Sequence, residues 1–188
     1  MQPTLSILIP TLRHRHDGFS RLYASINEQR SLLNAWQSVE VLFDPRAEDI
    51  TTGEKRNDLI HRARGKYVWH NDDDDELYPH SLEKILAAAE TDCDVMAVNG
   101  IITMKTRTVR WFIGLGYEYQ AEFWDGEEVY VRFPNHLAPI KREKIKDIKF
   151  PHITQQEDYQ WALAVRAAGV LKTETVIAEP IYNYIFLK

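Results

Sequence analysis

The feature that most constrains this chain is a short apolar segment that breaks abruptly into consecutive carboxylates. Residues 66–70 read Lys-Tyr-Val-Trp-His, and after Asn71 the chain continues as Asp72, Asp73, Asp74, Asp75 and Glu76. Aromatic and β-branched residues favour a strand. Neighbouring carboxylates repel each other by about 2–3 kcal/mol per pair at an effective dielectric constant of about 20. The pattern therefore predicts a buried strand that ends in an acidic loop, whose side chains we expect to stay out of the core.

Two interpretations of this acidic loop are open. Water and salt can screen the charges, which makes it a solvated acidic turn. A divalent cation relieves the repulsion better, and Mg²⁺ or Mn²⁺ takes oxygen ligands. The helix expected next begins at Pro79 and carries Leu82, Ile85, Leu86 and Ala89 on one face. A loop between a strand end and a helix supports the metal interpretation, because ligands bind at that edge of α/β sheets.

Strand and helix patterns alternate through the first half of the chain. Apolar runs predict strands at residues 5–9, 39–43, 67–70 and 95–104. Two amphipathic helices are expected between the first three strands. One is capped by Asp17 and carries Phe19, Leu22, Tyr23, Ile26 and Leu33 on one side. The other is opened by Thr51-Thr52-Gly53, runs from Glu54 to Arg64 and is ended by Gly65. This alternation implies a parallel sheet with right-handed crossovers.

After Gly100 the pattern changes to aromatic, glycine-broken segments. Residues 106–113 and 117–124 are expected to form antiparallel strands or a hairpin, 135–140 a strand, 142–148 a short helix, 157–168 a helix with Trp161, Ala164, Val165 and Ala168 on one face and Gly169 at its end, and 175–178 and 181–186 two strands split by Pro180. We expect one α/β domain over residues 1–188, with a mostly parallel sheet, helices on both faces and a smaller antiparallel portion in the second half. Residues 1–100 are expected to bind nucleotide and 101–188 to line the same edge.

Composition and charge argue against a protein that binds nucleic acid or anionic membranes through its overall charge, or that spans a membrane. The net charge of −5 gives no overall attraction to nucleic acid or anionic membranes, and basic residues cluster only at 13–16 and 105–110. The single Cys93 excludes an internal disulfide and fits a reducing compartment. The sequence shows no signal peptide and no run of about 20 apolar residues. We expect a soluble cytoplasmic protein, at most peripheral at a membrane.

Polar residues outside the acidic loop have both functional and structural interpretations. Asp44 ends a strand, and Lys55 and Arg56 lie near a helix start, where phosphate is attracted, although a solvated first turn explains them equally well. Glu157 and Asp158 begin a helix, so they are either site residues or partners of the helix dipole.

Three more side chains are open to two interpretations. His136 is either a ligand or phosphate contact or a structural histidine. Trp111 and Trp124 either stack on a sugar ring or pack in the core.

Four segments, taken in order, resemble a known family. They are Ser6-Ile7-Leu8-Ile9-Pro10-Thr11, Gly53-Glu54-Lys55-Arg56-Asn57, Gly65-Lys66-Tyr67-Val68 running into Asp72–Asp75, and Glu157-Asp158-Tyr159. In this order they resemble family-2 glycosyltransferases of the GT-A fold, over about residues 4–170 of the chain. The resemblance implies metal-dependent, inverting transfer of a sugar from a nucleoside-diphosphate sugar, expected to be UDP-linked, to an acceptor hydroxyl. The acceptor stays open among a glycan, a lipid-linked sugar, a protein and a modified nucleic acid.

The resemblance also implies residue roles. Pro10, Thr11 and Asp44 would line the base and ribose; Lys55, Arg56 and Asn57 would lie near the ribose and diphosphate; Asp72 and Asp74 would end the Asp-x-Asp motif and hold Mn²⁺ or Mg²⁺, with Asp74 the direct ligand; Asp73 and Asp75 would lie on the donor side, with Asp75 facing the sugar; His136 and Glu157 would lie on the acceptor or phosphate side; Asp158 would be the general base.

The chain departs from the family pattern at three points. Asp44-Pro45-Arg46-Ala47 stands where many members carry an Asp-Gly turn, and Asn71 replaces an apolar residue. Because four aspartates follow one another, the assignment of the metal-binding aspartate is open by one residue. The alternative to an enzyme is a non-catalytic nucleotide- or sugar-binding module of the same fold.

Overall fold

A computed structural model of the 188-residue chain describes residues 2–47 and 49–186. The strands are β1 (Leu5–Pro10), β2 (Val39–Asp44), β3 (Tyr67–His70), β4 (Glu76–Leu77), β5 (Val95–Met104), β6 (Thr108–Ile113), β7 (Gln120–Trp124), β8 (Glu127–Arg132), β9 (Ile140–Lys141) and β10 (Glu174–Phe186). The helices are the 3₁₀ turn η1 (Arg13–Arg15) and α1 (His16–Leu32), α2 (Thr52–Arg62), α3 (Ser81–Ala89), α4 (Arg142–Ile145) and α5 (Glu157–Ala168).

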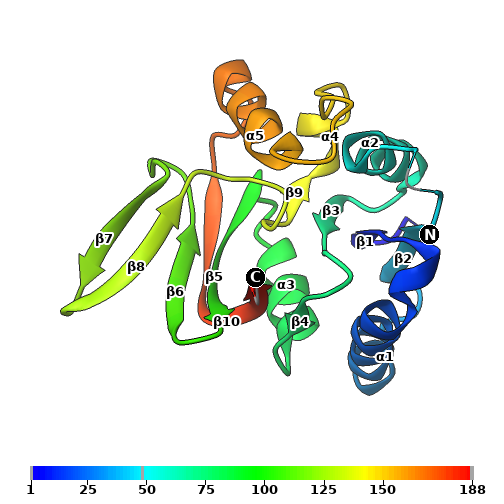
Figure 1. The fold of residues 1–188 in the computed structure, drawn as a ribbon, viewed down its shortest axis with the longest axis horizontal. Coiled ribbons are helices and arrows are strands. Elements are labelled where there is room, and N and C mark those ends of the chain that lie inside the picture. The colour runs from blue at the N-terminus through cyan, green and yellow to red at the C-terminus, as the bar shows by residue number, and fades with distance from the viewer. Residues whose placement is uncertain (1, 48, 187–188) are drawn as a thin grey trace.

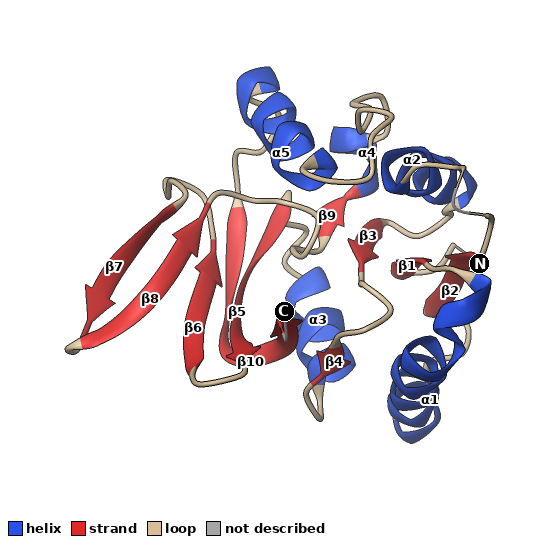
Figure 2. Ribbon diagram, in the orientation of Figure 1, coloured by secondary structure: helices blue, strands red, loops and turns tan. Residues whose placement is uncertain are grey.

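Within the described residues the strands form one ten-stranded sheet in the order β2-β1-β3-β9-β5-β6-β8-β7, with β10 beside β5 and β4 beside β10. β1 pairs in parallel with β2 and β3. The short β9 is antiparallel to both β3 and β5, so β5 runs in the same direction as β3 (Figure 2). β10 is parallel to β5, whereas β6 is antiparallel to it. The predicted α/β fold with an antiparallel portion in the second half is confirmed.

Helices cover both faces of the sheet, as predicted. α2, α4 and α5 lie along one side of β1, β3 and β9, and α1 and α3 lie along the other (Figure 1). The interior strands β1, β3 and the start of β5 are buried on both faces, which explains their continuous apolar sequence. Trp111 is 2% exposed and packs in this core, while Trp124 packs on Phe112, so packing accounts for both tryptophans.

Helix α2 opens at the predicted residues but ends earlier than predicted. Thr51 caps it through a capping box with Glu54, the helix starts at Thr52, and it ends at Arg62 rather than Arg64. Gly65 therefore does not end the helix. Its backbone N–H donates to the Ser6 Oγ at 2.8 Å, and a Cβ on this residue would lie 2.5 Å from that oxygen. Close approach of two backbones, not helix termination, requires glycine here.

Two other predicted helix starts are wrong. Asp17 does not cap α1: the N-cap residue is Arg15, Asp17 lies exposed in the first turn, and Leu33 follows the last turn. Pro79 lies before α3 rather than in its first turn, because His80 takes a left-handed N-cap conformation (φ 67°) and the helix begins at Ser81.

The second half contains a strand that the sequence patterns did not predict. β8 lies between β6 and β7, so those two strands do not pair with each other. The hairpin joins β7 to β8 through Asp125 and Gly126, both with positive φ. Residues 135–139 form a loop rather than a strand. β10 continues through Pro180 with two register shifts, so the predicted break is a bulge.

Helix α5 has the predicted bounds, Glu157–Ala168, but buries a partly different face from the predicted one. α5 ends at Gly169 in the left-handed conformation, as expected, and buries Trp161, Ala162 and Val165, whereas Ala164 and Ala168 are exposed. Cys93 is a buried free thiol. Among the described helices none has the length and apolar character needed to cross a bilayer.

Candidate active site

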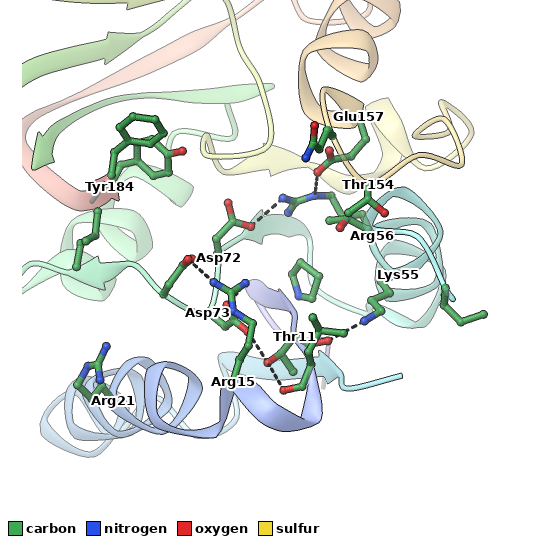
Figure 3. Close-up of a pocket in the computed structure, with 18 residues that line it drawn as sticks. Thr11, Arg15, Arg21, Lys55, Arg56, Asp72, Asp73, Thr154, Glu157 and Tyr184 are labelled. Atoms are coloured by element: carbon green, nitrogen blue, oxygen red, sulfur yellow. Dashed lines mark hydrogen bonds and ion pairs between the residues drawn. The ribbon is translucent and has the colours of Figure 1, made fainter. Parts of the chain in front are cut away.

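A cleft of about 890 Å³ opens at the carboxyl ends of β1 and β3 (Figure 3). It is lined by eight of the residues singled out from the sequence: Pro10, Thr11, Lys55, Arg56, Asp72, Asp73, Asp74 and Glu157. Thr154, Gln155 and Tyr184 line it from the second half of the chain. Asp44, Asn57, Asp75, His136 and Asp158 do not line it. The cleft therefore brings together the end of β1, the start of α2, the loop after β3 and the start of α5.

The acidic loop is not solvated as expected. Asp73 and Asp75 are 1% and 2% exposed, and among the four aspartates only Asp74 has a largely exposed side chain, at 51%. Burial of adjacent carboxylates is tolerated because each has a partner from a distant part of the chain. These partners, described next, were not visible in the sequence.

Arg56 connects the acidic loop to α5. Its guanidinium donates to Asp72 Oδ1 at 2.8 Å and to Glu157 Oε1 at 3.2 Å (Figure 3). Burial alone would raise the pKa of Asp72, but the charge of Arg56 and the nearby His136 outweigh burial and hold that pKa well below its usual range. The NH1 group of Arg56 is buried without a hydrogen-bond partner. A buried, charged donor that lacks a partner at a cleft wall is suited to an anionic ligand.

Arg15 and Thr11 hold the middle of the acidic loop from the other side. Arg15 contacts Asp73 Oδ1 at 2.8 Å and also pairs with Asp74. The Thr11 hydroxyl donates to Asp73 Oδ2 at 2.5 Å. Burial raises the pKa of Asp73, although these partners act in the opposite direction. Asp74 is thus the carboxylate of the loop that is most open to the cleft.

Asp75 differs from the expectation that it faces a donor sugar. One carboxylate oxygen accepts from the Tyr182 hydroxyl at 2.8 Å and the other from the Ile185 N–H at 2.8 Å. The Tyr182 hydroxyl also accepts from the Asp72 N–H at 3.0 Å. Burial, and then the charge of Asp72, raises the pKa of Asp75 to about 8. Asp75 therefore joins the acidic loop to β10 instead of entering the cleft.

The residues expected near the base and ribose are occupied by protein partners. Asp44 binds Arg46 through Oδ2 at 2.9 Å from Nε and 2.7 Å from NH2. The Lys55 amine donates to the carbonyls of Thr11 and Arg46 at 2.8 and 2.7 Å. Asn57 binds both backbone groups of Phe150 at 2.9 Å. Asn57 therefore links α2 to the segment before α5. Lys55 links α2 to the loops that follow β1 and β2.

Asp158 lies one imidazole ring away from the acidic loop. The His136 ring nitrogens are 3.5 Å from Asp72 Oδ2 and 3.6 Å from Asp158 Oδ2, beyond ordinary hydrogen-bond length. His136 is 6% exposed, whereas the Asp158 side chain is one-third exposed. Glu157 points instead to Arg56, so the two neighbouring acids serve different parts of the site.

Sequence reasoning missed several residues of this site. Arg15 was visible only as part of a basic cluster, and Tyr182 gave no signal at all. His70 was predicted only as the last residue of a strand: it is buried at the end of β3, and burial, together with the charge of Arg56, lowers its pKa well below the usual value. The lowered pKa favours the neutral form of this imidazole.

The chain is similar to known proteins both in sequence and in fold. The model of glycosyl transferase family 2 matches residues 24–149. Crystal structures of S. aureus TarS residues 1–349 are similar in fold: alone (14% identity, TM-score 0.64), with UDP (16%, 0.67) and with UDP-GlcNAc (14%, 0.63). No curated protein matches the sequence.

The structural matches cover 97–98% of this chain but only 59–60% of the TarS chains. At such low identity they show a shared fold. The family match extends over more than half of the sequence, and it includes α2, β3 and the acidic loop. The chain belongs to glycosyl transferase family 2.

Proposed function

We propose that this protein transfers a sugar from a nucleoside-diphosphate sugar to an acceptor hydroxyl, with inversion at the anomeric carbon. The proposed nucleotide of the donor is UDP. Family membership and the UDP and UDP-GlcNAc complexes of similar TarS structures support this class of donor. One observation carries the proposal: Arg56 bridges the acidic loop and α5 at a cleft wall and keeps one buried N–H group without a partner. A donor diphosphate supplies the missing acceptor.

In this proposal the nucleotide lies over the end of β1. Pro10 and Thr11 line the cleft there, and the carboxylate of Asp44, held by Arg46, supports the loop behind them. The diphosphate lies between Arg56 and Asp74. Arg15 and Arg21 also line the cleft, so several cations surround the position of the phosphates.

The acidic loop fits a divalent ion that arrives with the donor. Mg²⁺ is usually held by one or two carboxylates together with substrate phosphates and water. Asp74 and Asp72 offer two such carboxylates at the cleft. No group of three or more His, Cys, Asp or Glu within residues 2–47 and 49–186 is arranged to hold an ion alone. When bound there, Mn²⁺ or Mg²⁺ would offset the negative charge that develops on the leaving diphosphate.

Asp158 is the proposed general base. Its one-third exposed carboxylate lies at the start of α5, across His136 from Asp72. From that position it accepts the proton of the acceptor hydroxyl as the oxygen attacks the anomeric carbon opposite to the leaving diphosphate. We assign donor binding mainly to residues 1–100 and the acceptor side mainly to 101–188 of one domain.

The Asp158→Asn variant tests the assignment of the base, with Asp147→Asn as an exposed carboxylate-to-amide control outside the cleft. Donor turnover, with water as the acceptor, is measured for a panel of UDP-sugars with Mn²⁺. General-base assistance contributes about 10²–10⁴ in rate, so Asp158→Asn should be at least about a hundredfold slower. Its binding of UDP should stay normal.

Near-normal turnover by Asp158→Asn would remove this residue from the role. Binding of UDP by the wild-type protein with no turnover of any donor would favour the non-catalytic binding module instead.

A further inference from the structure

Arg15 stands between two hollows of the molecule. The main cleft lies on one side, and a smaller hollow of about 330 Å³ at the start of α1 lies on the other. Four side chains line both: Arg15, Arg21, Asp73 and Asp74. The Arg15 side chain is 39% exposed and rises from the 3₁₀ turn η1 (Figure 3). It therefore has open space on both sides.

The contacts of Arg15 place a positive charge at the proposed metal ligand. One terminal nitrogen pairs with Asp74, and the other lies 2.8 Å from Asp73 Oδ1. The guanidinium thus neutralises Asp74, the most exposed of the four aspartates, where a divalent ion would bind. A metal ion and Arg15 cannot both pair closely with Asp74 without strong repulsion between the two cations.

Asp73 does not depend on Arg15 alone. The Thr11 hydroxyl donates to its second oxygen at 2.5 Å, and that contact is independent of the Arg15 side chain. Arg15 can therefore leave Asp74 without stripping Asp73 of every partner. The Arg15 side chain would then enter the main cleft, which receives the donor phosphates in the proposed function.

We propose that Arg15 is the resident counter-ion of Asp74, and that it transfers from this carboxylate to the donor diphosphate when the metal ion binds. The inference rests on the proposed function, because it takes Asp74 as the metal ligand. It makes metal and donor binding cooperative: the ion alone must displace Arg15, whereas the donor gives the displaced guanidinium a new anionic partner.

The test measures binding rather than turnover. Mn²⁺ is titrated into the nucleotide-free protein, and free Mn²⁺ is followed by its electron paramagnetic resonance signal. UDP is then titrated calorimetrically at saturating Mn²⁺. The variants are Arg15→Gln, Arg15→Lys, Asp74→Ala and the control Arg13→Gln, which removes a charge from the same turn but lines neither hollow.

Arg15→Gln should bind Mn²⁺ alone about three- to tenfold more tightly than the wild-type protein, because the competing charge is gone. The same variant should bind UDP with Mn²⁺ about three- to tenfold more weakly, because a phosphate partner is lost. Arg13→Gln should match the wild type in both titrations, and Arg15→Lys should keep the wild-type Mn²⁺ affinity.

Unchanged or weaker Mn²⁺ binding by Arg15→Gln would overturn the counter-ion role, and unchanged UDP binding would overturn the transfer. If Asp74→Ala loses Mn²⁺ while Arg15→Gln behaves as the wild type, only this inference fails. Wild-type Mn²⁺ binding by Asp74→Ala would instead refute the metal site of the proposed function.

Discussion

The hydroxyl of Tyr182 is the point at which β10 holds the acidic loop, and Tyr182→Phe removes only that atom. The ring is fully buried and packs edge-on against Trp69 and Trp111, with centroids 6.0 and 6.3 Å away. Phenylalanine keeps these contacts. Two hydrogen bonds are lost: the one donated to Asp75 and the one accepted from the Asp72 N–H. The substitution therefore separates hydrogen bonding from packing.

The expected loss of stability follows from the two buried polar groups that lose their hydrogen-bond partner. A buried polar group without its partner costs about 1–3 kcal/mol, and here a carboxylate and a backbone N–H both lose one. We expect Tyr182→Phe to lower the free energy of unfolding by about 2–4 kcal/mol. Tyr67→Phe is the matched control, because Tyr67 is equally buried but donates to a single carbonyl, that of Cys93, at 2.8 Å. Its loss should be about 1 kcal/mol.

Urea unfolding followed by tryptophan fluorescence and by circular dichroism measures both variants. The dependence of the unfolding free energy on urea should be unchanged, so that midpoints can be compared directly. If Tyr182→Phe costs no more than Tyr67→Phe, the hydroxyl does not hold the acidic loop. Hydrogen bonding by Tyr182 would then not be what makes burial of Asp75 tolerable.

Three further substitutions test other parts of the structure. Arg56→Lys keeps the charge but loses the planar fork between Asp72 and Glu157, so the affinity for UDP with Mn²⁺ should fall at least about tenfold in calorimetry; an unchanged affinity would contradict the phosphate assignment. Gly65→Ala places a Cβ 2.5 Å from the Ser6 Oγ and should cost about 1–3 kcal/mol in urea unfolding, so a wild-type midpoint would contradict the close-approach argument. Burial raises the pKa of Glu40, but hydrogen bonds from Ser6 and Arg64 outweigh it and leave the pKa below its ordinary 4.5. The ionised group therefore stabilises the fold above that pH and loses this effect as pH falls through the lowered value, so Glu40→Gln should be less stable than wild type at pH 7 and approach it in acid, where a constant difference would count against the pairing.

Local patterns in the sequence were sufficient for much of the fold. β1, β2, β3 and β5 coincide closely with the predicted runs, because each is a buried apolar segment bounded by polar or turn residues. The bounds of helix α5 and its end at Gly169 were predicted equally well. β8 was not predicted, although Val129 and Val131 are buried in alternation with the polar residues Glu128, Tyr130 and Arg132.

The candidate site was predictable in its positions but not in its contacts. The sequence pointed to Arg56, Asp72 and Glu157, and the structure places these three side chains in one bridge. It did not indicate that Asp75 pairs with Tyr182, 107 residues away along the chain. Pairings over such distances are set by how the strands assemble, so no local pattern encodes them. This is why carboxylates expected in solvent are buried instead.

The central claim is that a donor diphosphate binds between Arg56 and a metal ion held by Asp74. Calorimetric titration of UDP into the protein, with Mn²⁺ and with chelator, tests it most directly when wild type is compared with Asp74→Ala and with Asp147→Ala, an exposed acid outside the cleft. Chelator should weaken UDP binding by wild type and Asp147→Ala at least about tenfold, whereas Asp74→Ala should bind equally weakly with and without Mn²⁺. Equal UDP affinity in all three proteins, unaffected by chelator, would contradict it.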